Sequence, residues 1–184
     1  MVNMKNNAFL PVLNGIGFQV IWWLVILFQN NAIAPVMGLI LLWLWFSPTR
    51  TLDIKLMIAV TILGTLIDGA LTLSGIFVFE QRHQLVAFWP IPVWLSLLWS
   101  ALAVTLVHSL SLFRNRRALA ALVGGHLAPL SYLAGAKLGA VTLGTETLFT
   151  YFILAGIWAV AFPLCFYLSK RLDSSELKTS TQAV

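Results

Sequence analysis

Long apolar runs separated by short polar turns make up most of the chain. Six of these runs can form helices, and polar turns such as Gln29–Asn31 and Glu80–Gln84 separate them. A helix needs about 20 apolar residues to cross the hydrocarbon core of a bilayer, and most of the runs approach that length. The pattern predicts helices over residues 11–28, 34–46, 55–79, 90–113, 118–141 and 148–168, the fourth beginning at Pro90 or Pro92.

The composition agrees with a membrane protein. Hydrophobic residues make up 60% of the 184 residues and charged residues 9%, whereas soluble domains contain about 25% charged residues. We therefore expect an all-α polytopic membrane protein with about six transmembrane helices. Residues 1–169 would form the transmembrane domain. Residues 170–184 would form a polar cytoplasmic tail, which is rich in Ser and Thr and which we expect to be disordered.

The distribution of basic residues predicts the orientation of these helices. The net charge is +5, which in a soluble protein would suggest a nucleic-acid partner. Here nine of the eleven Lys and Arg fall on the side of Lys5, in short turns such as Arg114–Arg117, and only Arg82 and Lys137 fall on the other side. Because cytoplasmic loops carry the excess of Lys and Arg, both termini are predicted to be cytoplasmic. Membrane lipids are the expected partners, and nucleic acid is not.

Asp68 is the most informative polar residue. It lies 13 positions after Lys55, about 20 Å along the predicted helix and therefore inside the hydrocarbon core. An ionised carboxylate at that depth is costly unless it is paired, solvated or protonated. Thr61, Thr65 and Thr72 share its helix face. The carboxyl group either holds helices together by hydrogen bonds or marks a ligand or proton site.

The fifth run contains residues that are unusual in a helix. Pro129 leaves the carbonyl of Gly125 without its usual donor. The helix therefore either breaks there or packs tightly through small residues, such as the GxxxG pair formed by Gly135 and Gly139. Tyr132 lies about 22 Å along this helix, which is the predicted depth of Asp68. His126 points somewhat away from Tyr132 and is either a hydrogen-bonded structural residue or a ligand.

His108 and the absence of standard catalytic and metal-binding motifs further restrict the kinds of site that the chain can contain. His108 lies about 9 Å from the cytoplasmic end of the fourth predicted helix. It either exchanges protons near neutral pH or caps the helix beside the basic turn. The sequence contains no HExxH, GxSxG, P-loop or paired-histidine spacing. Its only cysteine, Cys165, is expected to be an inert buried thiol. We therefore expect no metal and no cofactor.

Several segments form a recognisable set: Asp68-Gly69, Pro92 to Leu95, Leu98-Trp99, Thr105 to Leu110, and Gly124 to Gly139. Together they resemble a family of short bacterial inner-membrane proteins known only as a domain of unknown function. The resemblance implies a location in the bacterial inner membrane and brings no activity. It also implies a shared polar set, which consists of Asp68, Trp99, His108, Pro129 and Tyr132.

We favour a multi-pass protein that binds or transports a small or lipid-like ligand at a polar intramembrane site around Asp68. One alternative is an intramembrane enzyme that modifies a lipid, using Asp68 with His108 or His126. Another is a membrane scaffold or accessory subunit. The sequence leaves open whether the chain forms a homo-oligomer. The candidate ligand-binding residues are Thr65, Asp68, Thr72, Trp99, His108, His126 and Tyr132.

Overall fold

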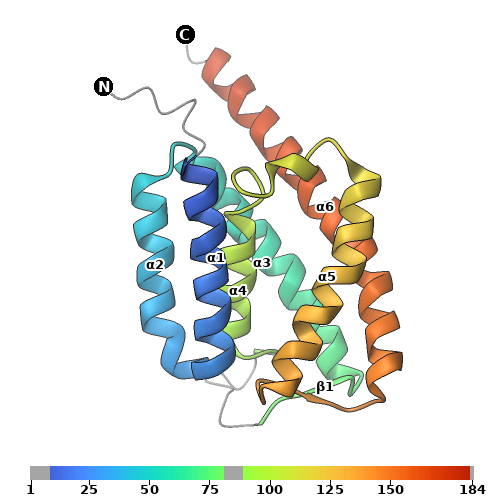
Figure 1. Cartoon of the computed structure of the whole chain (residues 1–184). Coiled ribbons are helices and arrows are strands. Elements are labelled where there is room, and N and C mark those ends of the chain that lie inside the picture. Colours follow the sequence, from blue (N-terminus) through green and yellow to red (C-terminus); the bar gives the residue numbers. More distant parts are fainter. Residues whose placement is uncertain (1–8, 81–88, 183–184) are drawn as a thin grey trace.

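The computed structural model of the chain describes residues 9–80 and 89–182, with side chains through Asp173. Lys5 and Arg82, which entered the prediction of orientation, lie outside the described residues. The described part is helical apart from one two-stranded sheet. The α3–α4 pair lies between the α1–α2 pair and the α5–α6 pair (Figure 1). The helices are α1 (Phe9–Phe28), α2 (Ile33–Phe46), α3 (Arg50–Leu73), α4 (Val93–Ala103), α5 (Arg117–Lys137) and α6 (Thr147–Gln182).

Four stretches of the described chain are long and apolar enough to cross a membrane, judged by length and composition. They cover residues 9–46, 50–73, 117–137 and 147–173. The first stretch contains both α1 and α2, which run side by side (Figure 1). The short 3₁₀ turn η2 (Gln29–Ala32) joins them, and Gln29 adopts a positive φ of 50°. The predicted all-α class is therefore confirmed, and the long apolar helices are compatible with a membrane protein.

Two glycines end helices earlier than predicted. Gly75 has φ of 76°, and the amides of Gly75 and Ile76 bond back to Thr72 and Leu71. Gly139, with φ of 81°, closes α5 through the same pattern of backbone bonds. Both are Schellman caps, which need a left-handed residue just after the helix. The predicted ends at residues 79 and 141 were wrong, and Gly139 is a cap rather than half of a GxxxG packing pair.

Helix α4 is shorter than predicted. It ends at Ala103, whereas the sequence predicted a helix that continues to residue 113. Turns and the 3₁₀ helix η4 (Ser111–Phe113) follow. The buried Asn14 of α1 provides alternative partners for this backbone: its amide donates to the Val104 carbonyl at 3.2 Å, and its carbonyl accepts from Ser109 N–H and Oγ. Local side-chain bonds of this kind compete with helical hydrogen bonds. His108 therefore lies in a turn segment and not on a helix face.

Helix α5 continues through Pro129, so the sequence-based alternative of a broken helix is excluded. The tight packing expected of its small residues occurs instead at Gly124 and Gly125, which face α6. A β-carbon at Gly124 would approach the Trp158 carbonyl to 2.8 Å, and one at Gly125 would approach the Ala155 carbonyl to 3.1 Å. The backbones of α5 and α6 can approach closely because these side chains are missing.

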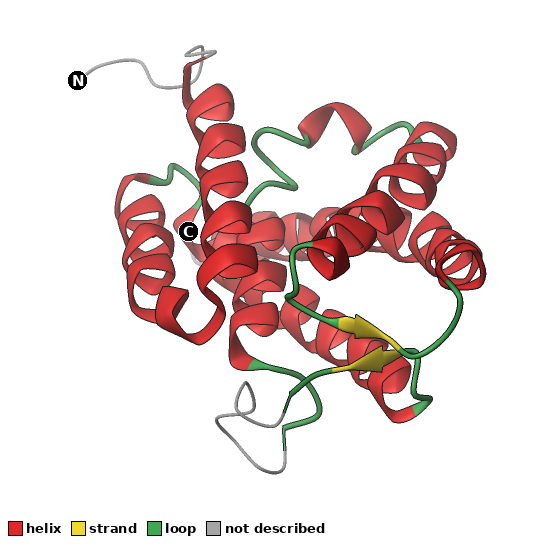
Figure 2. Cartoon of the chain, turned by 60° about the horizontal axis from the view of Figure 1, so that its bottom comes forward, coloured by secondary structure: helices red, strands yellow, loops and turns green. Residues whose placement is uncertain are grey.

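A small sheet joins the ends of α3 and α5. β1 (Phe77–Val78) pairs antiparallel with β2 (Thr142–Leu143), with Phe77 opposite Leu143 (Figure 2). At the other end of the molecule, α6 continues to Gln182. The prediction of a disordered tail over residues 170–184 was therefore wrong for its helical part. Arg114 forms a salt bridge with Asp173 of this helix, which ties α6 to the turn before α5.

Candidate functional site

Asp68 is fully buried at the meeting point of three helices. Its Oδ2 atom accepts a hydrogen bond of 2.7 Å from Trp99 Nε1 of α4. The Tyr132 hydroxyl of α5 donates to Oδ1 at 2.9 Å. The prediction that Asp68 and Tyr132 lie at the same depth is confirmed. Two donors on neighbouring helices supply the partners that a buried carboxyl group requires.

The positions of these two donors depend on close aromatic packing. Trp99 lies over Gly64 of α3, where a β-carbon would overlap atoms of the indole ring. Trp99 also stacks on Trp158 of α6, with ring centroids 4.9 Å apart and an interplanar angle of 7°. Tyr132 stacks on Phe77 at 5.2 Å and 13°. Rings held in this way can rotate little, so the two donors stay directed at Asp68.

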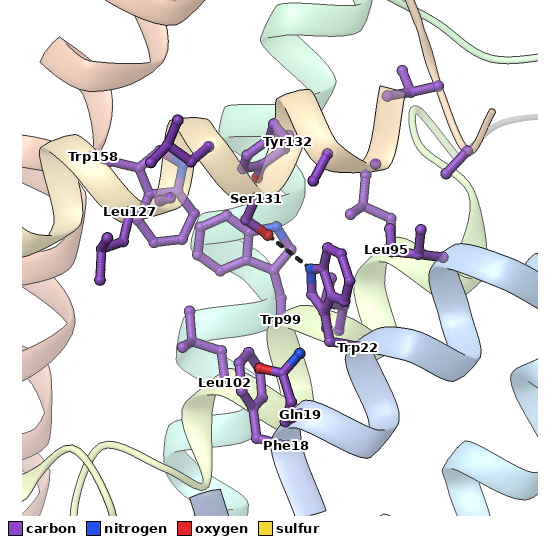
Figure 3. Close-up of a pocket in the computed structure, with 18 of the residues that line it drawn as sticks. Phe18, Gln19, Trp22, Leu95, Trp99, Leu102, Leu127, Ser131, Tyr132 and Trp158 are labelled. Atoms are coloured by element: carbon purple, nitrogen blue, oxygen red, sulfur yellow. Dashed lines mark hydrogen bonds between the residues drawn. The ribbon is translucent and has the colours of Figure 1, made fainter. Parts of the chain in front are cut away.

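Trp99 and Tyr132 also form part of the wall of a pocket of about 640 Å³ (Figure 3). The volume falls within the range of small-molecule sites. Asp68 is not among the residues that line it, because the two rings cover the carboxyl group. The lining residues come mainly from α1, α4 and α5 and include Phe18, Trp22, Trp94, Leu95, Leu102, Val123, Leu127 and Ser131.

The pocket has a mostly apolar rim on the outside of the bundle, which also includes the exposed side chain of Gln19. Trp23, Leu127 and Leu130 line it and are 47%, 61% and 52% exposed. One hydrogen bond links α1 and α5 across it, from Trp22 Nε1 to Ser131 Oγ at 2.7 Å (Figure 3). In a membrane, a rim of this kind would face acyl chains rather than water.

The structure brings together three of the seven predicted site residues, namely Asp68, Trp99 and Tyr132. Thr65 is buried in α3, and its hydroxyl has no hydrogen-bond partner in the described part of the chain. The Thr72 hydroxyl donates to the backbone carbonyl of Asp68. His126 is exposed and bonds to the Leu122 carbonyl of its own helix, so the prediction that it belongs to this site was wrong.

His108 belongs to a second polar cluster, which the sequence analysis missed. Its Nε2 atom lies 3.1 Å from both carboxylate oxygens of Asp53, a fully buried residue in the first turn of α3. Ser47, Thr49 and Trp43 also donate to this carboxylate. The sequence placed Asp53 in a turn before the third helix. Asp53 lies four positions after Thr49, and acidic residues are favoured in the first turn of a helix, a signal that could have identified it.

Neither histidine bonds to Asp68. His108 bonds to Asp53 and Thr49, while His126 bonds to a backbone carbonyl. The enzyme hypothesis required one of them within hydrogen-bond reach of Asp68, and its acid–base pairs are therefore contradicted.

Replacing His108 with phenylalanine should lower the free energy of unfolding by about 1.5–3 kcal/mol. The reason is that the buried Asp53 carboxylate would lose its hydrogen bond to His108 Nε2. The phenyl ring can keep the edge contact that His108 makes with Trp43. Thermal and denaturant unfolding in detergent would measure the loss. The matched substitution His126→Phe should change stability by less than about 0.5 kcal/mol because the site is exposed. Equal losses in the two variants would contradict the role given to the Asp53 cluster.

Comparison with protein families gave one finding that covers most of the chain. Residues 11–164 match the model of the family described as "Protein of unknown function (DUF2878)". Comparisons with curated proteins and with solved structures found no significant match.

Proposed function

The chain belongs to this DUF2878 family of unknown function, and we propose from its geometry that it is a membrane protein that binds a lipid-like ligand in the pocket between α1, α4 and α5. Ligand sites are typically concave and mostly apolar, with a few fixed polar groups. The pocket combines these properties with an exposed, mostly apolar rim.

The proposal depends on the volume of the pocket together with its position beside Asp68 and at the outside of the bundle. A space of about 640 Å³ lies beside a buried carboxyl group that two ring donors bond, and its exposed rim is apolar apart from Gln19. A water-soluble ligand would have to cross hydrocarbon to reach such a rim, whereas a lipid already lies there. This favours entry from the plane of the membrane.

In this proposal Asp68 acts through its neighbours. It is shielded from the pocket by Trp99 and Tyr132, so it holds the two rings that form the wall and does not contact the ligand. This differs from the sequence-based hypothesis, which made Asp68 the central ligand-binding group. Asp68 is a positioning residue, and the contact surface is aromatic.

The arrangement also supports a membrane topology. We propose six crossings of the inner membrane, with both ends on the cytoplasmic side. The start of α1 and the end of α6 lie at the same end of the bundle (Figure 1). Arg50 and Arg117 begin α3 and α5 at that end, and Arg114 lies in the connection before α5, as the positive-inside rule expects of a cytoplasmic face.

Photolabelling of the protein in phosphatidylcholine nanodiscs tests the binding site. We expect a long-chain alcohol that carries a diazirine to label peptides of α1, α4 and α5 saturably, and excess unlabelled alcohol to displace it. Ala134→Phe places a ring in the pocket that Ala134 lines. This variant should reduce the saturable labelling by about fivefold or more, since the ring occupies ligand volume.

The matched control is His126→Phe, which introduces the same ring on an exposed part of α5 outside the pocket. It should label like the wild type. Labelling that does not saturate in the wild type, or that Ala134→Phe leaves unchanged in a folded protein, would contradict the proposed function.

A further inference from the structure

Helices α1 and α5 contact each other at the end of the pocket that lies away from the chain termini. There a β-carbon at Gly135 would meet the Ile26 side chain at 3.3 Å, and Gln29 Nε2 donates to the Gly139 carbonyl at 3.3 Å. Toward the termini the two helices lie farther apart (Figure 1). The exposed rim of the pocket therefore extends between α1 and α5 toward the end of the bundle that holds the termini.

The side of α5 that lines the pocket continues toward two arginines at that end. The pocket-lining residues of α5 begin with Val123 and Gly124. Arg116, which precedes α5, and Arg117, which begins it, lie seven positions earlier, about 10 Å along the helix axis. Residues seven apart share a helix face, so the two arginines continue the line of the pocket wall. Leu119 lies between them and the pocket and is 36% exposed, which keeps the intervening surface apolar.

Arg116 and Arg117 differ from the other arginines described near this end of the bundle. Arg50 donates to two backbone carbonyls at the end of α2, Arg114 is paired with an acidic residue of α6, and Arg171 bonds to a tyrosine of its own helix. The side chains of Arg116 and Arg117 are exposed and form no hydrogen bond or ion pair within the described part of the chain. Unpaired guanidinium groups at a membrane surface attract anionic head groups.

Building on the proposed function, which supplies the pocket, we infer that the ligand is an anionic phospholipid of the leaflet on the side of the termini. Its phosphate lies at Arg116 and Arg117, and one acyl chain passes Leu119 and enters the pocket between α1 and α5. The lining of α5 extends from Val123 to Leu138, about 22 Å, which exceeds the roughly 15 Å of hydrocarbon in one leaflet. The described lining residues carry no charge, so the phosphate stays outside the pocket with its counter-charge.

Two photoreactive phospholipids with identical acyl chains test this inference in nanodiscs. One has a phosphatidylglycerol head group and the other a phosphatidylcholine head group, and each is present at the same low mole fraction in phosphatidylcholine. The glycerol lipid should label the pocket peptides of α4 and α5 about fivefold more than the choline lipid, because choline cancels the charge of its phosphate. Equal labelling by the two lipids in the wild type would overturn the inference.

The double variant Arg116→Gln, Arg117→Gln tests the head-group contact. It should reduce the excess labelling by the glycerol lipid to about twofold or less and leave labelling by the choline lipid unchanged. The matched control is Lys170→Gln, Arg171→Gln, which removes two positive charges from α6 toward the same end of the bundle. It should keep most of the excess. Equal losses in the two double variants would assign the preference to the general charge of this face and overturn the inference.

The place of the diazirine along the acyl chain tests the orientation of the lipid. A diazirine close to the ester should label the α5 peptide that contains Leu119 and Val123, and one close to the methyl end should label the peptide that contains Ala134 and Leu138. The reverse order would show that the lipid enters from the other leaflet, which contradicts the inference.

The outcomes separate this inference from the proposed function. If the diazirine alcohol labels saturably but the glycerol lipid has no advantage, the head-group inference is overturned and the pocket remains a binding site. If labelling by the alcohol never saturates, the proposed function fails as well. The wild-type comparison of the two lipids decides the question even if a variant does not fold.

Discussion

Replacing Gly64 with alanine is expected to lower the free energy of unfolding by about 3–5 kcal/mol, since it both overpacks a core and breaks a buried hydrogen bond. A β-carbon at this position would overlap the Trp99 ring, and that ring is also stacked on Trp158. Trp99 would have to move, and Asp68 would then lose its shortest hydrogen bond. Denaturant titration in detergent, followed by tryptophan fluorescence, measures the effect.

Gly156→Ala is the matched control for this experiment. Gly156 lies within α6, and a β-carbon there would meet no atom within 4 Å. Its substitution should be neutral or stabilise the protein by up to about 1 kcal/mol through helix propensity. A Gly64→Ala protein as stable as the Gly156→Ala protein would show that Trp99 is not held against α3 in the way described.

Asp68→Ala is expected to cost about 2–5 kcal/mol, because Trp99 Nε1 and the Tyr132 hydroxyl would both be left as buried donors without an acceptor. The same unfolding titration measures the loss. We also expect the variant to lose saturable lipid labelling, because the two rings that line the pocket would no longer be held by a common partner.

Asp68→Asn separates hydrogen bonding from charge at this position. The amide carbonyl can still accept from Trp99 or Tyr132, so we expect less than half of the stability loss of Asp68→Ala. If Asp68→Ala unfolds at the wild-type denaturant concentration, the carboxyl group does not hold the aromatic wall. If Asp68→Asn costs as much as the alanine variant, the interaction depends on charge rather than on hydrogen bonds.

The sequence predicted the part of the site that depends on regular helices. Counting 1.5 Å per residue from Lys55 and from Arg117 placed Asp68 and Tyr132 at the same depth, and the structure joins them at 2.9 Å. The counting worked because α3 and α5 are continuous over those residues. It could not reveal that Trp99 covers Asp68, since this depends on the packing of one ring on Gly64.

Prediction from the sequence failed where side-chain hydrogen bonds from a distant part of the chain interrupt a helix. Nothing local in the fourth apolar run signals its end at Ala103, because the interruption involves Asn14, which lies 90 residues away from Val104. Once that segment is a turn, His108 faces Asp53 instead of the pocket. The error over His126 has a different origin. Its ring bonds to a backbone carbonyl of its own helix, and the spacing of residues along the sequence does not reveal which partner a polar side chain takes.

The most direct test of this account is an experimental structure of the protein purified in nanodiscs with its native membrane lipids. The account predicts elongated density between α1, α4 and α5 that contacts the Trp99 and Tyr132 rings, with Asp68 behind them and bonded to both. A structure in which α1 closes against α5 without a cavity, or in which the Asp68 side chain points to acyl chains, would contradict it.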